Sequence, residues 1–267
     1  MAITSFIPKV WSARLKDNLH KALVFGALCN RNWEGDIAQW GDTVHINNLA
    51  DVTVRAYTPN TDIEEPEQLS GSDVTLTIDH GAYYNFYVND VDAAQARADI
   101  MEAAMRNAAH KLAEDTEAYI LGVIREGAGT KASGAIPKGG VYELIVQIKT
   151  ALDEKNVPRA DRKLIVPASV EAELLLDERF ITGNGALSDA RLAEGSIARA
   201  AGFDIYISND LQNEIVAMTP DGVTFANQIT RIEAYRREKG FDDGVKGLSL
   251  CGAKVVIPDC VYIHTIG

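Results

Sequence analysis

The residue types that most often carry out catalysis are present in this sequence, but their spacing matches no catalytic pattern. The five histidines are scattered, and no HExxH pair places two of them on one helical face to bind zinc. The acidic pairs Glu64-Glu65 and Asp242-Asp243 fall in segments that predict polar turns, whereas an acid–base pair needs environments that separate the two pKa values. The Gly-rich stretch 127–131 lacks the GxxxxGK[ST] spacing of a phosphate-binding loop. We therefore expect no catalytic, metal-binding or cofactor-binding site.

The charge balance argues against a surface built to bind nucleic acid. The 267 residues include 38 acidic and 26 basic side chains, which gives a formal net charge of -12. Binding to phosphates needs clustered Lys and Arg. The compact basic cluster of this sequence, Arg236, Arg237 and Lys239, lies among acidic residues that dilute it. We interpret this cluster as an acceptor for an acidic protein segment. An acidic wall can still enclose DNA without binding it.

The composition is that of a globular protein, with 46% hydrophobic and 24% charged residues. The length allows one large domain or two modest ones. No run of about eighteen apolar residues predicts a membrane span, and the beginning of the chain lacks the apolar stretch of a secretory signal. Three cysteines without a CxxC pair are expected to be reduced, buried thiols.

The first 34 residues have the pattern of an arm. Phe6, Trp11 and Leu15 belong to a series of apolar residues that recurs at roughly helical spacing, with basic residues between them. Such a stripe needs another surface to cover it.

A β-rich section follows the arm. Segments 41–47 and 74–79 alternate apolar and polar residues, which predicts two strands. The polar stretch between them predicts either the tip of a two-stranded ribbon or a solvated loop. We favour the ribbon, which should lie on another surface because an isolated pair of strands is marginally stable in water. Its tip carries a concentration of negative charge that includes Asp62, Glu64, Glu65 and Glu67.

The clearest predicted element is a helix over 92–126. This segment contains no proline and no glycine before Gly122, and Gly127 ends it. At about 1.5 Å per residue the helix would be on the order of 50 Å long, which suits an elongated molecule. A Gly-rich break is predicted at 127–140. Beyond it, the pattern predicts helices at 141–155 and 168–176, and strands at 163–166, 203–208, 214–218, 231–238 and 254–266.

Several strings, taken in their order along the chain, resemble the coat proteins of tailed bacteriophages. They are FIPKVWS at 6–12, GDTV at 41–44, NTDI at 60–63, LSGS at 69–72, FYVND at 86–90, AAGFDIYISN at 200–209, FDDGVKGL at 241–248 and GAKVV at 252–256. The resemblance covers nearly the whole chain and implies the α+β Hong Kong 97-type capsid fold.

The resemblance also implies a division of the chain into the segments of that fold. These are an N-terminal arm (1–34), an extended β-hairpin or E-loop with its flanking strands (35–91), and the spine helix of the peripheral or P-domain (92–135). They continue with a mixed α/β axial or A-domain (136–226), a return to the P-domain β-sheet (227–253) and a C-terminal strand that rejoins the A-domain (254–267).

The function implied is that of a major capsid protein. Many copies would assemble as pentamers and hexamers into an icosahedral shell that encloses double-stranded DNA, built in the host bacterial cytoplasm and retained in the virion. A portal, a separate scaffolding protein and a decoration protein are the expected partners, with no membrane and no cofactor. The residues expected at contacts between subunits are Phe6, Trp11, Leu15, Asp62, Glu64, Glu65, Glu67, Arg236, Arg237 and Lys239.

One departure from the family is informative. Some members lock their shells with a lysine–asparagine isopeptide bond whose lysine lies on the β loop. This sequence has no lysine between Lys21 and Lys111, so we expect that cross-link to be absent.

Two alternatives remain open at this stage. An encapsulin-type compartment that holds protein cargo would use the same fold. A small-oligomer α/β enzyme built on 136–226 would belong to a different class, and would need a pocket with convergent polar groups.

Overall fold

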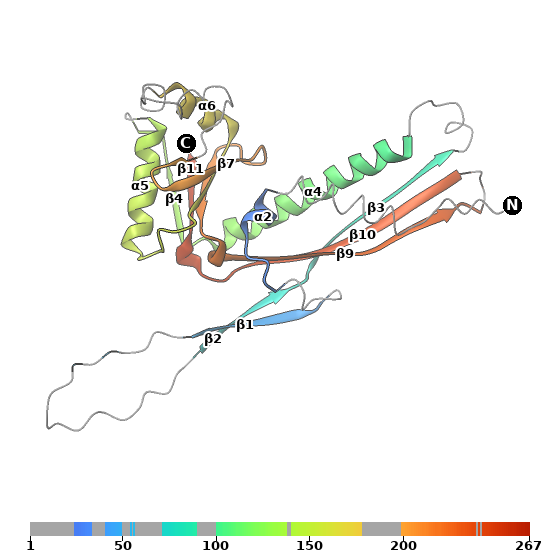
Figure 1. The fold of residues 1–267 in the computed structure, drawn as a ribbon, viewed down its shortest axis with the longest axis horizontal. Coiled ribbons are helices and arrows are strands. Elements are labelled where there is room, and N and C mark those ends of the chain that lie inside the picture. The colour runs from blue at the N-terminus through green and yellow to red at the C-terminus, as the bar shows by residue number, and fades with distance from the viewer. Residues whose placement is uncertain are drawn as a thin grey trace.

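The computed structural model describes residues 24–33, 41–49, 54, 56, 71–89, 100–137, 140–177, 199–238, 240 and 242–267. The fold is α+β, as predicted, and the strands among these residues form three separate sheets. Figure 1 shows an elongated molecule in which a long helix and long strands lead away from a more compact region, while a two-stranded ribbon projects away from the helix.

The elongated part is a three-stranded antiparallel sheet with one helix along it. The strand order is β3 (His80–Asn89), β10 (Asp242–Val255) and β9 (Val223–Arg236). Helix α4 (Ile100–Gly127) covers one face, where its residues Met105, Ala109, Leu112 and Ala113 pack against side chains of the sheet. The predicted helix is confirmed from residue 100 onward, and 92–99 lie outside the described residues.

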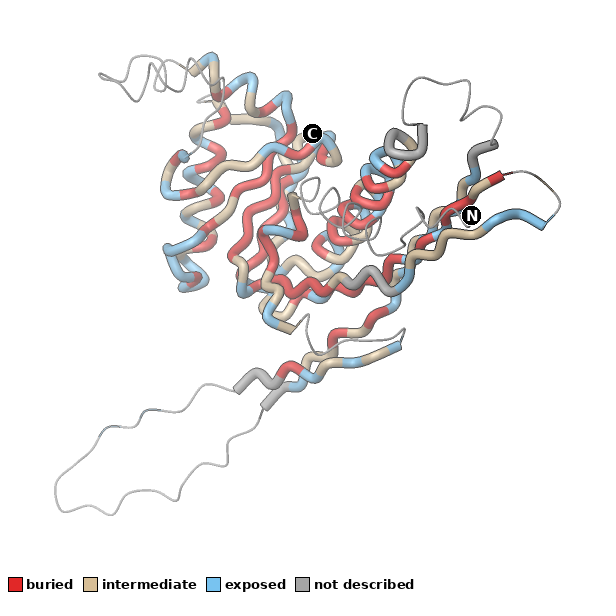
Figure 2. Tube along the Cα trace, turned by 45° about the vertical axis from the view of Figure 1, so that its right-hand side comes forward, coloured by how far each residue is buried: buried red, intermediate tan, exposed pale blue. Residues whose placement is uncertain are grey.

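The compact region is a six-stranded mixed sheet with helices against it. Its order is β4 (Thr130–Gly134), β11 (Val261–Ile266), β8 (Glu214–Met218), β5 (Lys163–Val166), β7 (Phe203–Ile207) and β6 (Arg199–Ala200). Apolar residues of α5 (Val141–Glu154) and α6 (Ala168–Leu176) join the core of this sheet, with Ile148 and Leu174 among the fully buried ones. In Figure 2 the buried residues gather in this sheet and along α4.

The ribbon consists of β1 (Thr43–Leu49) and β2 (Gly71–Thr77), which pair antiparallel from Thr43 opposite Thr77 to Leu49 opposite Gly71. The two predicted strands are thus confirmed as an antiparallel pair, with bounds that differ from the predicted 41–47 and 74–79. At its base, the ribbon packs on the body through Ile46, Leu76 and Ile78, in one cluster with Ala226 and Leu250. The other described side chains of the ribbon are intermediate or exposed (Figure 2).

Two other strand predictions and one predicted break are corrected by the structure. The segment 254–266 is two strands, because the 3-10 turn Pro258–Cys260 interrupts it between the end of β10 and the start of β11. The predicted break at 127–140 contains strand β4, which gains its hydrogen bonds by pairing in parallel with the distant β11. The strand predicted at 231–238 is the end of the longer β9.

Candidate functional site

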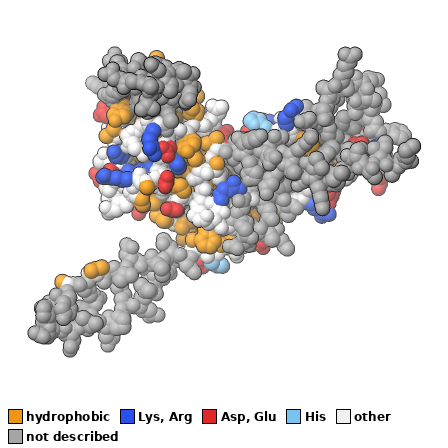
Figure 3. Space-filling model, viewed as in Figure 1, with side chains coloured by type: hydrophobic (Ala, Val, Ile, Leu, Met, Phe, Trp, Pro, Cys, Tyr) orange, Lys and Arg blue, Asp and Glu red, His pale blue; other side chains and the backbone are white. Residues whose placement is uncertain are grey.

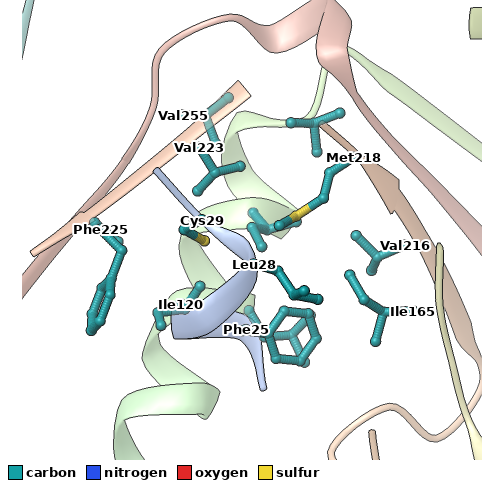
Figure 4. Close-up of a cluster of buried hydrophobic side chains, with 14 of the residues drawn as sticks. Phe25, Leu28, Cys29, Ile120, Ile165, Val216, Met218, Val223, Phe225 and Val255 are labelled. Carbon is teal, nitrogen blue, oxygen red and sulfur yellow. The ribbon is translucent and has the colours of Figure 1, made fainter. Parts of the chain in front are cut away.

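The first candidate surface is the place where the arm joins the body. The short helix α2 (Phe25–Leu28) packs on α4, and Phe25 and Leu28 are buried in one cluster with Ile120 (Figure 4). Beyond α2, Asn30 N donates to Val223 O at 2.9 Å, and Phe225 N donates to Asn30 O at 2.9 Å. We call Val24–Asn30 the arm anchor, because this part of the predicted arm is packed on the body.

Glu117 of α4 ties the arm anchor to the spine helix. Its Oε1 accepts a hydrogen bond from the backbone N–H group of Val24, and Asp210, in the loop between β7 and β8, is near enough to influence its pKa. Burial, with Asp210 as the next cause, raises the pKa of Glu117 to about 7. The spine helix and the arm anchor therefore meet at one carboxyl group, close to this loop.

A second candidate surface is the ribbon, whose direction is set at its base by a polar cluster. His80 Nε2 lies 2.6 Å from Asp115 Oδ2 on α4, and its ring stacks on Tyr119 with centroids 4.3 Å apart. The Tyr119 hydroxyl donates to Asp79 Oδ1 at 2.6 Å. Asp79 and His80, which lie between the ribbon's second strand and the body of β3, are thus held by residues of α4.

Gly252 of β10 allows the base of the ribbon to lie against the sheet. A Cβ atom at Gly252 would stand 2.3 Å from the backbone oxygen of Thr77. No side chain fits in that space, so the crossing of β2 over β10 depends on glycine at this position.

The third candidate surface is the face of the three-stranded sheet opposite α4. Tyr83 and Tyr87 are 79% and 56% exposed, and Leu248, which pairs with Tyr83, is also exposed. Lys246 lies on this face with its Nζ 2.8 Å from Glu233, which also pairs with Arg231. Because these charges already have partners, the tyrosine rings are the groups that this face offers to a neighbour. Tyrosine is enriched at the energetically important positions of protein interfaces.

The two arginines of the basic cluster predicted to accept an acidic segment already have acidic partners within the chain. Arg236 Nη1 lies 2.9 Å from Asp243 Oδ1, and Arg237 Nη1 lies 3.1 Å from Asp242 Oδ2. The guanidinium of Arg237 also stands 4.4 Å from the ring centroid of Tyr87. An incoming carboxylate would have to compete with these ion pairs. The other predicted contact residues lie outside the described residues: Phe6, Trp11, Leu15, Asp62, Glu64, Glu65, Glu67 and Lys239.

The compact region exposes further apolar side chains. Val146 on α5, Leu176 at the end of α6 and Ile207 on β7 are all exposed. Figure 3 shows hydrophobic side chains on the surface of this region, interspersed with Lys, Arg, Asp and Glu. A mixed surface of this kind suits a contact between subunits that is partly apolar.

The described residues contain no arrangement suited to metal binding, since no group of three or more His, Cys, Asp or Glu side chains comes together among them. All three cysteines are free and buried, as predicted. Burial raises the pKa of Cys29 and of Cys251 to about 12, so neither thiol is poised as a nucleophile.

None of the described helices is long and apolar enough to cross a membrane.

Comparison with known proteins identifies the family to which this chain belongs. A family model described as phage capsid protein matches residues 73–263, well over half of the chain. The chain belongs to the phage capsid protein family. This capsid protein is similar to a solved structure from Mycobacterium phage Che8, at 28% sequence identity and a TM-score of 0.77, with 91% of this chain and 90% of that chain covered. No curated protein sequence matches it.

More distant structures support the fold of this capsid protein. The capsid structure of the cyanophage P-SCSP1u is 17% identical with a TM-score of 0.73, and covers 92% of this chain and 88% of its own. A virus-like particle from Pyrococcus furiosus is 14% identical with a TM-score of 0.62, covering 94% and 96% respectively. The predicted Hong Kong 97-like fold and the predicted role as a major capsid protein are therefore confirmed, and the protein is a structural component of a virion shell.

Sequence reasoning missed several residues that organise these surfaces, among them Phe25, Glu117, Asp115 and Tyr83. The arm was predicted as one segment to residue 34, although its last residues are part of the core. Glu117 and Asp115 lie on a helix that was predicted from the spacing of its apolar residues, and that spacing says nothing about the contacts of polar residues. The one available signal was the aromatic run Tyr83-Tyr84 at the start of a strand, where alternation places one ring on each face.

Proposed function

We propose that copies of this capsid protein assemble as pentamers and hexamers into an icosahedral shell that encloses a double-stranded DNA genome. The observation that carries the proposal is the ribbon, which is fixed at its base by the Asp79–His80 cluster and otherwise projects from the body (Figure 1). An isolated pair of strands is marginal in water, so a neighbouring subunit is the natural surface to cover it. The proposed divisions are the arm 1–34, E-loop 35–91, spine segment 92–135, A-domain 136–226, P-sheet return 227–253 and final strand 254–267.

The proposed contacts combine apolar burial with charge pairing. Phe6, Trp11 and Leu15 of the arm would be buried on a neighbour, as would the flanks of the ribbon. The acidic tip, Asp62 to Glu67, would approach the basic cluster Arg236–Lys239 of another subunit. Single exposed ion pairs contribute only about 0–1 kcal/mol, and here they would exchange with the pairs to Asp242 and Asp243. They would therefore set register more than strength.

The proposed partners are those expected of a phage capsid protein. A portal and a separate scaffolding protein would take part in assembly in the host cytoplasm, and a decoration protein could stabilise a shell that has no lysine for the β-loop cross-link. The protein would act without catalysis and without a cofactor. Membership of a capsid family supports a structural role over the small-oligomer enzyme built on 136–226.

An encapsulin-type compartment is the second candidate, because the Pyrococcus furiosus virus-like particle shares the fold. The contents of the particle decide between the two. Particles purified from the native source should be treated with nuclease, and their DNA and protein then analysed. Nuclease-resistant double-stranded DNA of uniform length supports the genome shell. Particles that hold a single cargo protein and no DNA would overturn it in favour of the compartment.

A further inference from the structure

The helices of the compact region carry an excess of negative charge. Together, α5 and α6 contain five acidic residues and one basic residue, Lys149. Because Leu144 and Ile148 of α5 are buried against the sheet, the opposite stripe of this helix faces outward. We call this exposed stripe the α5 stripe; it consists of Glu143, Val146, Gln147, Thr150 and Glu154. It offers an apolar side chain and two carboxylates on one surface.

The other face of the six-stranded sheet carries a cluster with excess positive charge. Successive side chains of a strand alternate between its two faces. The neighbours of residues buried under the helices therefore lie on the far face: Lys163 next to Leu164, Arg199 next to Ala200 and Asp204 next to Phe203. We call Lys163, Arg199 and Asp204 the edge cluster, because β6 is the edge strand of this sheet.

The edge cluster can bind a further carboxylate. Arg199 Nε lies 2.8 Å from Asp204 Oδ1, and Lys163 Nζ lies 3.2 Å from Asp204 Oδ2. Two cations share one carboxylate, so one positive charge is in excess. The side chain of Arg199 is 69% exposed, and a guanidinium has five N–H donors in a planar fork. Arg199 is therefore the group of this cluster that an incoming carboxylate would meet.

The charges of the two surfaces indicate how copies of the chain would meet. The α5 stripe lies on the side of the sheet away from α4 (Figure 1), and the edge cluster lies on the opposite face. Contact between two α5 stripes would bring like charges together, which is costly, whereas contact between an α5 stripe and an edge cluster brings opposite charges together. A contact between two different surfaces is heterologous, and it repeats from copy to copy until a ring closes.

We propose that the α5 stripe of one copy docks on the edge cluster of the next copy, so that the compact regions join head to tail in a ring. The rings would be the pentamers and hexamers of the shell, so this contact rests on the function proposed above. A single exposed ion pair is weak, but a closed ring repeats it at every boundary. The contact fixes the direction in which neighbours follow one another.

Charge reversal on each surface of the full-length protein tests the contact. One variant carries Glu143→Lys with Glu154→Lys, a second carries Arg199→Glu, and a third combines all three changes. Each preparation is expressed with the candidate scaffolding protein, and its rings and shells are separated on a density gradient and counted by electron microscopy. The control Lys131→Glu reverses an exposed cation on β4, at the other edge of the same sheet.

Each single-surface reversal replaces attraction with repulsion, and should weaken every contact in the ring by at least about tenfold. Rings and shells should therefore be lost in the first two variants, and recovered in part at high salt because salt screens exposed charges. The third variant should assemble, since its two surfaces are again opposite in charge. The control should assemble like the wild type. An unchanged thermal midpoint of the subunit shows that each variant is folded; if Arg199→Glu is not, Arg199→Gln should still lower the yield.

Two results would overturn the contact while leaving the proposed function in place. In the first, the wild type forms shells and the single-surface variants form them equally well. In the second, the folded third variant assembles no better than the variants from which it was combined. A wild-type chain that forms neither rings nor shells would contradict both the contact and the proposed function.

Discussion

Replacing Phe25 by alanine should detach the arm from the body while leaving most of the fold intact. Phe25 is completely buried between α4 and the six-stranded sheet, with Ile120, Ile165 and Val216 around it (Figure 4). Helix α2 has four residues and no side-chain cap, so it has no stability of its own. Its position depends on burial of this ring.

The expected magnitude follows from the size of the group removed. Truncation of a buried Phe to Ala typically costs about 3–5 kcal/mol, and each 1.4 kcal/mol is about a tenfold change in an equilibrium constant. Docking of the arm anchor should therefore weaken by at least about a hundredfold. Limited proteolysis with mass spectrometry should show new cleavage between residues 20 and 35, circular dichroism should change little, and closed shells should no longer form.

A matched substitution separates loss of the anchor from loss of stability. Phe203 is also completely buried, but it lies in the other large cluster, beneath α5 and α6. Phe203→Ala should lower the thermal stability of the compact region without exposing residues 20–35 to protease. The reasoning is refuted if Phe25→Ala keeps a protected arm junction and normal shells, or if both variants show the same cleavage at the junction.

Three further predictions concern the ribbon and the exposed sheet face. Gly252→Ala places a methyl group against the Thr77 oxygen and should cost about 1–3 kcal/mol, seen as a lower thermal midpoint and as faster hydrogen exchange at 71–79. Tyr83→Ala removes an exposed ring, so it should change the stability of the isolated subunit by no more than about 0.5 kcal/mol but reduce shell yield; normal yield would remove this face from the assembly contacts. Reversing Glu64 and Glu65 together to lysine should cause misassembly, and normal shells that resist high salt would contradict the proposed pairing of the acidic tip.

The pattern of apolar and polar residues predicted those helices and strands whose ends are set by turn-forming residues in the sequence. Strands β5 and β8 have the predicted bounds, because each is a short, mainly apolar run followed by a turn, and helix α6, which begins after Pro167, has them as well. Strand β4 was missed because Thr130–Gly134 contains small residues with no clear alternation, and it is a strand only by pairing with β11, some 130 residues later in the chain. Pairing between distant segments leaves no mark in a local window.

The candidate surfaces were predictable only in outline. The alternation of residues 74–79 indicated a ribbon, and the length of the α4 segment indicated a spine, since both signals are local. The groups that hold these parts together are not local: Glu117 meets Val24 across 93 positions, and Tyr119 meets Asp79 across 40. The arginines of the predicted acceptor were also paired with near neighbours, Asp242 and Asp243, which the sequence had shown only as a diluting negative charge.

The central claim is that this chain builds a closed shell from copies of itself. The most direct test is to express it alone and with a candidate scaffolding protein, separate the products by size, and image the largest species by negative-stain electron microscopy. The account predicts closed shells of uniform diameter in at least one of the two preparations. A monodisperse dimer or tetramer that does not change when the scaffold candidate is present would contradict it.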